Sequence, residues 1–309
     1  GSSASLIAGV CEGLREAGYA VGGFDACTVS DVFKGSGLSS SAAFEDMIGT
    51  ILNHLYNGGR ISFVEISCIS QYAENVFFGK PCGLMDQIAC AAGGIVAIDF
   101  ADPKAPVVEK LDLDLTALGY RLCIINTGGN HADLTADYAA VPAEMKAVAA
   151  ALGKEVLREV DEQELLREIP RLRESLGDRA ILRALHFVEE NRRVLAQREA
   201  LERGDLDGFF AGVLASGRSS FCYLQNVYTT KNVAEQGLSL ALCLAERTLS
   251  GERAAWRVHG GGFAGTVQAF VPLSRVEELR RVMDGAFGAG SCKVLSIRPE
   301  GAIRVFDEE

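Results

Sequence analysis

Residues 34–46 (KGSGLSSSAAFED) are the stretch of this sequence best suited to bind an anion. Gly35 and Gly37 allow the backbone to approach oxygen atoms closely, because glycine has no side chain in the way. The three serines at residues 39–41 add hydroxyl groups that can donate to a phosphate or ligate a hard cation. The stretch lacks the Gly-Lys-Ser/Thr ending of a Walker loop. It therefore indicates a phosphate-binding loop of another kind, or a helix-capping loop of small residues.

Asp86 is the strongest candidate for acid–base chemistry. It follows the segment CGLM, whose apolar and glycine-containing character favours a carboxylate that accepts a proton from a hydroxyl group. An aspartate ahead of an apolar pattern also caps a helix well, here one over residues 87–91. The two interpretations are compatible, and both stay open at this point.

The elements around the glycine and serine stretch follow from its flanking patterns. Residues 25–33 predict a strand, and the apolar residues after the serines lie on one face of a helix that ends near residues 57–59. Strand, glycine-rich loop and helix is the order that directs backbone N–H groups and the positive end of a helix dipole at an anion. This order favours the phosphate-binding interpretation.

The rest of the chain predicts an α+β protein of two domains, over residues 1–115 and 116–309. Ser62 and Glu65 are typical of a capping box, and predict a helix that runs to about residue 78 and ends at Gly79. Residues 144–248 are expected to be mostly helical. Strands are expected at residues 95–100, 107–113, 120–126, 255–259, 266–271, 293–298 and 302–306, the last two paired as a hairpin.

Composition excludes several classes of function. The chain has 309 residues and a net charge of −11, which argues against nucleic acid or an anionic membrane as a partner. The nine cysteines are scattered without a C-x-x-C pair, which indicates reduced thiols in a cytoplasm and neither a zinc site nor a disulfide framework. No apolar run approaches the roughly 18 residues that span a membrane. The sequence does not predict an oligomeric state.

Three segments together resemble one family. GSGLSSSAA at residues 35–43 resembles the second motif of the GHMP kinases, in the triple-serine form found in galactokinases. YAENVFFGKPCGLMDQ at residues 72–87 is similar to the galactokinase segment that ends in Cys-Gly-Ile-Met-Asp-Gln. VHGGGFAGT at residues 258–266 resembles the third family motif, with Ala264 in place of a glycine. Because the motifs agree in order and spacing, the chain is identified as a galactokinase-like member of the GHMP kinases.

This resemblance implies a two-domain GHMP kinase fold: an N-terminal α/β domain without its first strands, and a C-terminal α+β domain of ferredoxin-like type. It implies ATP, Mg²⁺ and a sugar as ligands. Two glycine-rich segments would hold the ATP phosphates: Gly35, Ser36, Gly37, Leu38, Ser39, Ser40, Ser41, Ala42, Gly260, Gly261 and Gly262. Ser41 and Glu74 would ligate Mg²⁺. Asp86 would accept the proton of the sugar hydroxyl or orient that hydroxyl, and Gly83 and Tyr138 would line the sugar.

Without the resemblance, each of these residues has an ordinary structural interpretation. Glu74 would be a solvated carboxylate on a helix surface, Tyr138 a half-buried tyrosine, and residues 260–262 a β-turn. His131 could touch a ligand, but a lone histidine is more often structural. The family pattern favours the functional role for the first three.

The chain also departs from the family. The galactokinase signature Gly-Arg-x-Asn-x-x-Gly-Glu-His-x-Asp-Tyr, which supplies sugar contacts and an arginine partner for Asp86, is not found in the 309 residues. SSFCYLQNVYTTKN at residues 219–232 stands where many galactokinases have Ser-Cys-Pro-Glu-Leu-Asp. We expect phosphorylation of galactose at its anomeric hydroxyl. The alternatives are a kinase of another sugar or small alcohol, and a catalytically silent sugar sensor. We also expect that these 309 residues alone lack sugar kinase activity and associate.

Overall fold

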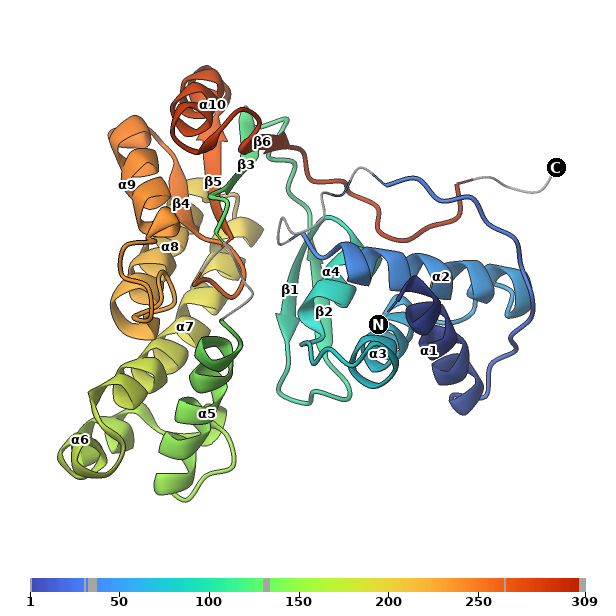
Figure 1. The fold of residues 1–309 in the computed structure, drawn as a ribbon, viewed down its shortest axis with the longest axis horizontal. Helices are drawn as coiled ribbons and strands as arrows, with labels where there is room; N and C mark the ends of the chain where they lie inside the picture. The colour runs from blue at the N-terminus through green and yellow to red at the C-terminus, as the bar shows by residue number, and fades with distance from the viewer. Residues whose placement is uncertain (1, 31, 33–37, 130–133, 264, 306–309) are drawn as a thin grey trace. The chain divides into compact units, whose positions relative to one another are not determined.

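The structure is a computed structural model that describes residues 2–30, 32, 38–129, 134–263 and 265–305, and Figure 1 shows it as a ribbon. The chain divides into two compact units, one of Gly1–Leu113 with Ile297–Glu309 and one of Asp114–Ser296. This grouping places the last residues with the first unit, where the sequence suggested a single boundary near residue 115. The division into domains 1–115 and 116–309 stays a proposal.

The first unit packs four α-helices and a small antiparallel sheet among its described residues. Its elements are α1 (Ser3–Glu16), α2 (Ser40–Tyr56), α3 (Phe63–Tyr72), a π-helical turn (Ala73–Phe78), α4 (Met85–Ala92), β1 (Ile95–Asp99) and β2 (Val107–Leu111). Its core is a cluster of buried apolar side chains contributed mainly by α1, α2 and α3: Val10, Leu14, Ile48, Leu52, Ile61, Ile66, Ile69 and Ala73. Burial of Ile48 and Leu52 in this cluster anchors the middle of α2, the helix whose first residues are the serines.

The capping box at the start of α3 forms as predicted. The backbone N–H of Glu65 donates to the Ser62 hydroxyl, and the N–H of Ser62 donates to the Glu65 carboxylate, both over 3.2 Å. Each such cap stabilises a helix by about 1 kcal/mol. Beyond Tyr72 the chain continues as the π-helical turn, and Gly79 ends it with φ of 81°.

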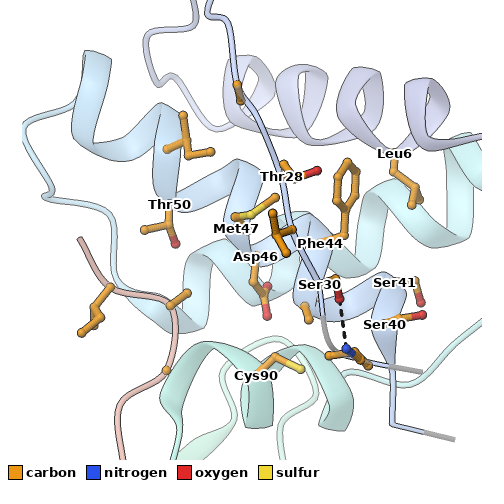
Figure 2. A pocket seen from close by; sticks show the side chains of 18 of the residues that line it. Leu6, Thr28, Ser30, Ser40, Ser41, Phe44, Asp46, Met47, Thr50 and Cys90 are labelled. Atoms are coloured by element: carbon orange, nitrogen blue, oxygen red, sulfur yellow. Dashed lines mark hydrogen bonds between the residues drawn. The ribbon is translucent and has the colours of Figure 1, made fainter. Parts of the chain in front are cut away.

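The strand predicted over residues 25–33 is wrong for the described residues 25–30, which are extended but form no strand. The physical reason is that a strand needs a partner, and no other described segment pairs with this backbone. Instead the segment lines a pocket of about 1250 Å³ with α2 and residues 301–305. Figure 2 shows Thr28 and Ser30 of this segment at the pocket, together with Phe44 and Met47 of α2.

The hairpin predicted between residues 293–298 and 302–306 is also wrong. β6 (Cys292–Leu295) pairs with β3 instead, and residues 296–305 form no strand. The later residues are held at the end of α4 and just beyond it. The N–H of Gly94 donates to the Arg298 carbonyl over 2.8 Å, and the N–H of Ala302 donates to the carbonyl of Ala91 in α4 over 3.2 Å. A side chain at Gly301 would lie 1.9 Å from the Ala91 carbonyl oxygen, so this close approach requires glycine.

The second unit combines a four-stranded antiparallel sheet with six α-helices among its described residues. The sheet has the order β4-β5-β3-β6, so that Cys123 of β3 lies opposite Ala269 of β5 on one side and Val294 of β6 on the other. Its elements are β3 (Tyr120–Asn126), α5 (Thr135–Ala151), α6 (Glu162–Leu176), α7 (Asp178–Glu202), α8 (Leu206–Ser219), α9 (Gly237–Leu249), β4 (Ala255–Val258), β5 (Thr266–Pro272), α10 (Leu273–Phe287) and β6. The α+β class is confirmed, with helices where residues 144–248 predicted them.

None of the nine cysteines is in a disulfide. Among the described helices, none is both long and apolar enough to cross a membrane.

Candidate functional site

A hydrogen bond joins the serine stretch to Asp86. Ser39 precedes α2 with a left-handed backbone (φ 54°), and its hydroxyl donates to the Asp86 carboxylate over 2.5 Å. Asp86 is the second residue of α4, whose N-cap is Leu84, so the helix-cap interpretation of Asp86 is wrong. Its side chain is exposed and not enclosed by apolar residues. The structure therefore places an accessible carboxylate beside the N-terminus of α2.

Part of the predicted phosphate loop lies outside the described residues. Gly35, Ser36 and Gly37 belong to that part, whereas Leu38, Ser39, Ser40, Ser41 and Ala42 are described. Ser40 and Ser41 form the first turn of α2, where backbone N–H groups have no partner within the helix. An anion near this turn meets the positive end of the helix dipole.

Ser41 and Glu74 offer two oxygen atoms suited to Mg²⁺. The Ser41 hydroxyl donates to Glu74 Oε1 over 3.0 Å, and the Glu74 side chain is buried. Neighbouring ligand oxygens in an octahedral Mg²⁺ shell, with bonds of about 2.0–2.1 Å, lie about 2.9 Å apart. The described residues hold no cluster of three or more His, Cys, Asp or Glu suited to a metal, and Mg²⁺ bound with phosphate and water needs only one or two protein ligands. The donor set fits Mg²⁺.

The Glu74 carboxylate has two further partners that sequence reasoning missed. Gln87 donates to Glu74 Oε2 over 3.1 Å and to Glu45 over 3.4 Å, and the Lys80 ammonium lies 3.1 Å from Glu74 Oε1. Burial, followed by the nearby Glu74 charge, raises the pKa of Glu45 from 4.5 to about 8. Gln87 is the last residue of the segment 72–87 that resembles the family, which is the signal that could have marked it.

Two amide side chains make hydrogen bonds to the backbone of Cys82, in the loop that carries Gly83. The N–H of Cys82 donates to the Asn75 side chain over 2.7 Å, and the Gln71 side chain donates to the Cys82 carbonyl over 3.1 Å. Gly83 itself is exposed, with no atom near the position that a side chain would take. The loop therefore offers backbone at the surface beside Asp86.

In the second unit, Tyr138 of α5 lies against the glycine turn that joins β4 to β5. Its hydroxyl donates to the Gly262 carbonyl over 2.8 Å, and its ring meets Phe263 edge to face at 5.4 Å. A side chain at Gly261 would lie 2.9 Å from the Tyr138 ring. Tyr138 and the glycine turn, both predicted as parts of the site, are thereby brought together. His131 and Ala264 lie outside the described residues.

Asn226 holds the same turn from the other side, and sequence reasoning missed it. Its side chain donates to the Gly261 carbonyl over 3.1 Å, and its own carbonyl accepts the N–H of Phe263. A side chain at Gly262 would lie 1.9 Å from that Asn226 carbonyl oxygen. Asn226 belongs to the segment that departs from the galactokinase pattern, so no motif marked it.

Known proteins resemble the chain in sequence. The family model described as GHMP kinases N terminal domain matches residues 5–94. The galactokinase of Streptomyces coelicolor is 33% identical over 288 residues, a match that covers 92% of this chain and 70% of that protein. The galactokinase of Glaesserella parasuis is 35% identical over 266 residues, covering 84% of this chain and 65% of that protein. The chain thus spans about two thirds of the length of these relatives.

Solved structures share the fold. The crystal structure of Lactococcus lactis galactokinase complexed with galactose aligns with a TM-score of 0.72 at 23% identity, covering 96% of this chain and 75% of that one. A D-glycero-D-manno-heptose 1-phosphate kinase from Bacteroides thetaiotaomicron aligns with a TM-score of 0.57 at 18% identity, covering 96% of this chain and 73% of that one.

Fold and sequence together define the class: the chain belongs to the GHMP kinase family, whose members include sugar kinases. Within that family it is a homologue of the galactokinases, at about 33% identity over most of its length.

Proposed function

We propose that the whole protein transfers the γ-phosphate of ATP to galactose and forms galactose 1-phosphate in the cytoplasm. The observation that carries this proposal is the hydrogen bond between Ser39 and Asp86. It joins the residue just before α2, whose first turn is suited to phosphate, to a carboxylate suited to accept a hydroxyl proton. The identity to galactokinases supports galactose over other acceptors.

In the proposed reaction, the anomeric oxygen of the sugar forms a bond with the γ-phosphorus. The bond between that phosphorus and the β–γ bridging oxygen breaks, ADP leaves, and the hydroxyl proton passes to Asp86. General-base assistance of this kind typically contributes about 10²–10⁴-fold to the rate. Ser39 orients the Asp86 carboxylate for this role. Residues 35–42 hold the phosphates, mainly by backbone N–H groups at the start of α2.

Ser41 and Glu74 would hold Mg²⁺, which neutralises charge on the transferred phosphate when it is bound. Gln87 fixes the orientation of the Glu74 carboxylate through its hydrogen bond. The turn at residues 260–262 is proposed to contact the phosphates, and Gly83 and Tyr138 to line the sugar. Because the Tyr138 hydroxyl donates to Gly262, we assign its sugar contact to the ring and not to the hydroxyl proton.

The proposal is tested by measuring ADP release with a coupled assay. The acceptors compared are galactose, other hexoses and small alcohols. The assay should be run on the 309-residue chain and on a version with natural upstream sequence where the gene encodes it. Turnover with galactose above all other acceptors supports the proposal. Preference for another acceptor would overturn the substrate assignment. Calorimetric binding of ATP and galactose without turnover in either version would identify a sugar sensor and overturn the enzymatic role.

A further inference from the structure

Lys80 places a positive charge on the same carboxylate oxygen that we assign to Mg²⁺. Its ammonium lies 3.1 Å from Glu74 Oε1, the oxygen that also accepts the Ser41 hydroxyl. The Glu74 side chain is 3% exposed and the Lys80 side chain is 64% exposed. The buried Glu74 carboxylate is thus paired with the ammonium group of a largely exposed lysine.

The π-helical turn brings these two residues together. In an α-helix, side chains three and four residues apart are neighbours, and residues as far apart as Glu74 and Lys80 are not. Here the wider turn and the left-handed Gly79 direct the backbone N–H of both Gly79 and Lys80 to the Glu74 carbonyl. The chain therefore doubles back over Glu74, and Lys80 follows at the point where its side chain can reach Oε1.

We propose that Lys80 is a stand-in cation for the metal site. Its ammonium neutralises Glu74 while the site is free of metal, and it leaves Oε1 when Mg²⁺ binds there with the nucleotide. This inference rests on the proposed function, because it takes Ser41 and Glu74 as the Mg²⁺ ligands.

Two physical consequences follow. Removing the partner of a buried carboxylate strongly destabilises the folded protein. Lys80 therefore stabilises the protein while no metal is bound. Since ammonium and metal ion compete for one oxygen, Lys80 also weakens metal binding and sets the metal concentration that the site needs. The ammonium group of an exposed lysine can leave the carboxylate and become hydrated at a small cost in free energy. A buried arginine bound through two N–H groups could not do so as easily.

The test compares Lys80→Met with Lys104→Met, an exposed lysine in the turn between β1 and β2. Melting temperature is followed while Mn²⁺ is added at a constant concentration of a non-hydrolysable ATP analogue. We expect Lys80→Met to melt at a lower temperature in EDTA and to need about three- to tenfold less Mn²⁺ for half of the metal-induced rise. Lys104→Met should follow the unchanged protein, and Lys80→Gln should repeat the shift with a polar side chain.

Four outcomes would overturn the inference. If Lys80→Met needs as much Mn²⁺ as the unchanged protein, or more, Lys80 does not compete with the metal. A loss of affinity for the analogue in EDTA, measured by calorimetry, would identify Lys80 as a phosphate ligand instead. If the unchanged protein binds the analogue but shows no Mn²⁺ effect, the metal site at Ser41 and Glu74 is wrong. If it binds no analogue at all, the proposed kinase function fails as well.

Discussion

At the scale of single residues, Asp86 and Ser39 face each other from the first turn of α4 and the start of α2. Replacing Asp86 by asparagine keeps the size and a hydrogen bond to Ser39 but removes the proton acceptor. We expect Asp86→Asn to lower kcat by about 10²–10⁴-fold, with dissociation constants for ATP and sugar almost unchanged. Steady-state kinetics and calorimetry measure the two effects, with the exposed Asp102→Asn as control. A variant with unchanged kcat would remove Asp86 from the chemistry.

The glycine turn allows a second comparison between neighbouring residues. Gly260 and Gly262 both have positive φ, of 67° and 81°, but only Gly262 is crowded, because a Cβ there would lie 1.9 Å from the Asn226 carbonyl oxygen. Gly260→Ala should cost about 1–2 kcal/mol of stability, the usual cost of a left-handed backbone. Gly262→Ala should cost more and should also weaken nucleotide binding, because the turn has to move. Thermal unfolding and titration with the ATP analogue measure both, and equal losses in the two variants would contradict the assigned role of the Asn226 contact.

At the scale of elements, α2 carries a buried acid without a hydrogen bond. Asp46 is 1% exposed, and neither of its oxygen atoms has a hydrogen-bond partner among the described residues. Figure 2 shows the Asp46 carboxylate pointing away from α2. Asp46 and Cys90 both line the pocket. Burial raises the pKa of Asp46 from 3.8 to about 8, and the nearby Ser70 hydroxyl opposes this shift without reaching hydrogen-bond geometry.

This shift predicts how the stability depends on pH. The folded protein holds the Asp46 proton more tightly than the unfolded chain does. The contribution of Asp46 to the free energy of unfolding is therefore fully present below about pH 4. As the pH rises from there towards about 8, this contribution falls by about 1.4 kcal/mol per pH unit. Asp46→Asn removes this dependence and should stabilise the protein more at pH 7 than at pH 5. Urea denaturation at both values, with the exposed Asp112→Asn as control, measures the difference; parallel profiles would mean that Asp46 is ionised in the folded state.

The elements that sequence predicted well are those whose signals are local. The capping box of α3 depends on Ser62 and Glu65 alone, and β3 is confirmed over Tyr120–Asn126 because its apolar pattern is continuous. The strands expected at residues 25–33 and 302–306 failed because each needs a partner that no local pattern specifies. A segment with strand-like residues stays merely extended when its backbone has no neighbour.

The same distinction holds for the candidate site. Motifs pointed to Ser41, Glu74 and Asp86, and the structure brings the first two within 3.0 Å. Lys80 and Asn226 were missed because their positions depend on the π-helical turn and on a contact between distant segments. Neither follows from spacing along a helix or strand.

At the scale of the whole molecule, the apolar pocket beside α2 predicts self-association of these 309 residues. Val29 and Leu55 line it and are 94% and 57% exposed, and large exposed apolar patches mark sites of association. We expect Leu55→Glu to shift the chain towards monomer on a sizing column. Leu118→Glu, which replaces a leucine 49% exposed in the other unit, should have no such effect. A monomeric unchanged chain would contradict this expectation.

The return of the chain from the second unit to α4 has a consequence for biosynthesis. Arg298 and Ala302 bind the end of α4, whereas the ribosome makes that helix before the whole of Asp114–Ser296. At typical elongation rates the nascent first unit waits on the order of 10–40 s for these residues. During that interval the carbonyl of Ala91 and the N–H of Gly94 lack their native partners. The first unit can therefore acquire these contacts only after the whole of the second unit has been translated.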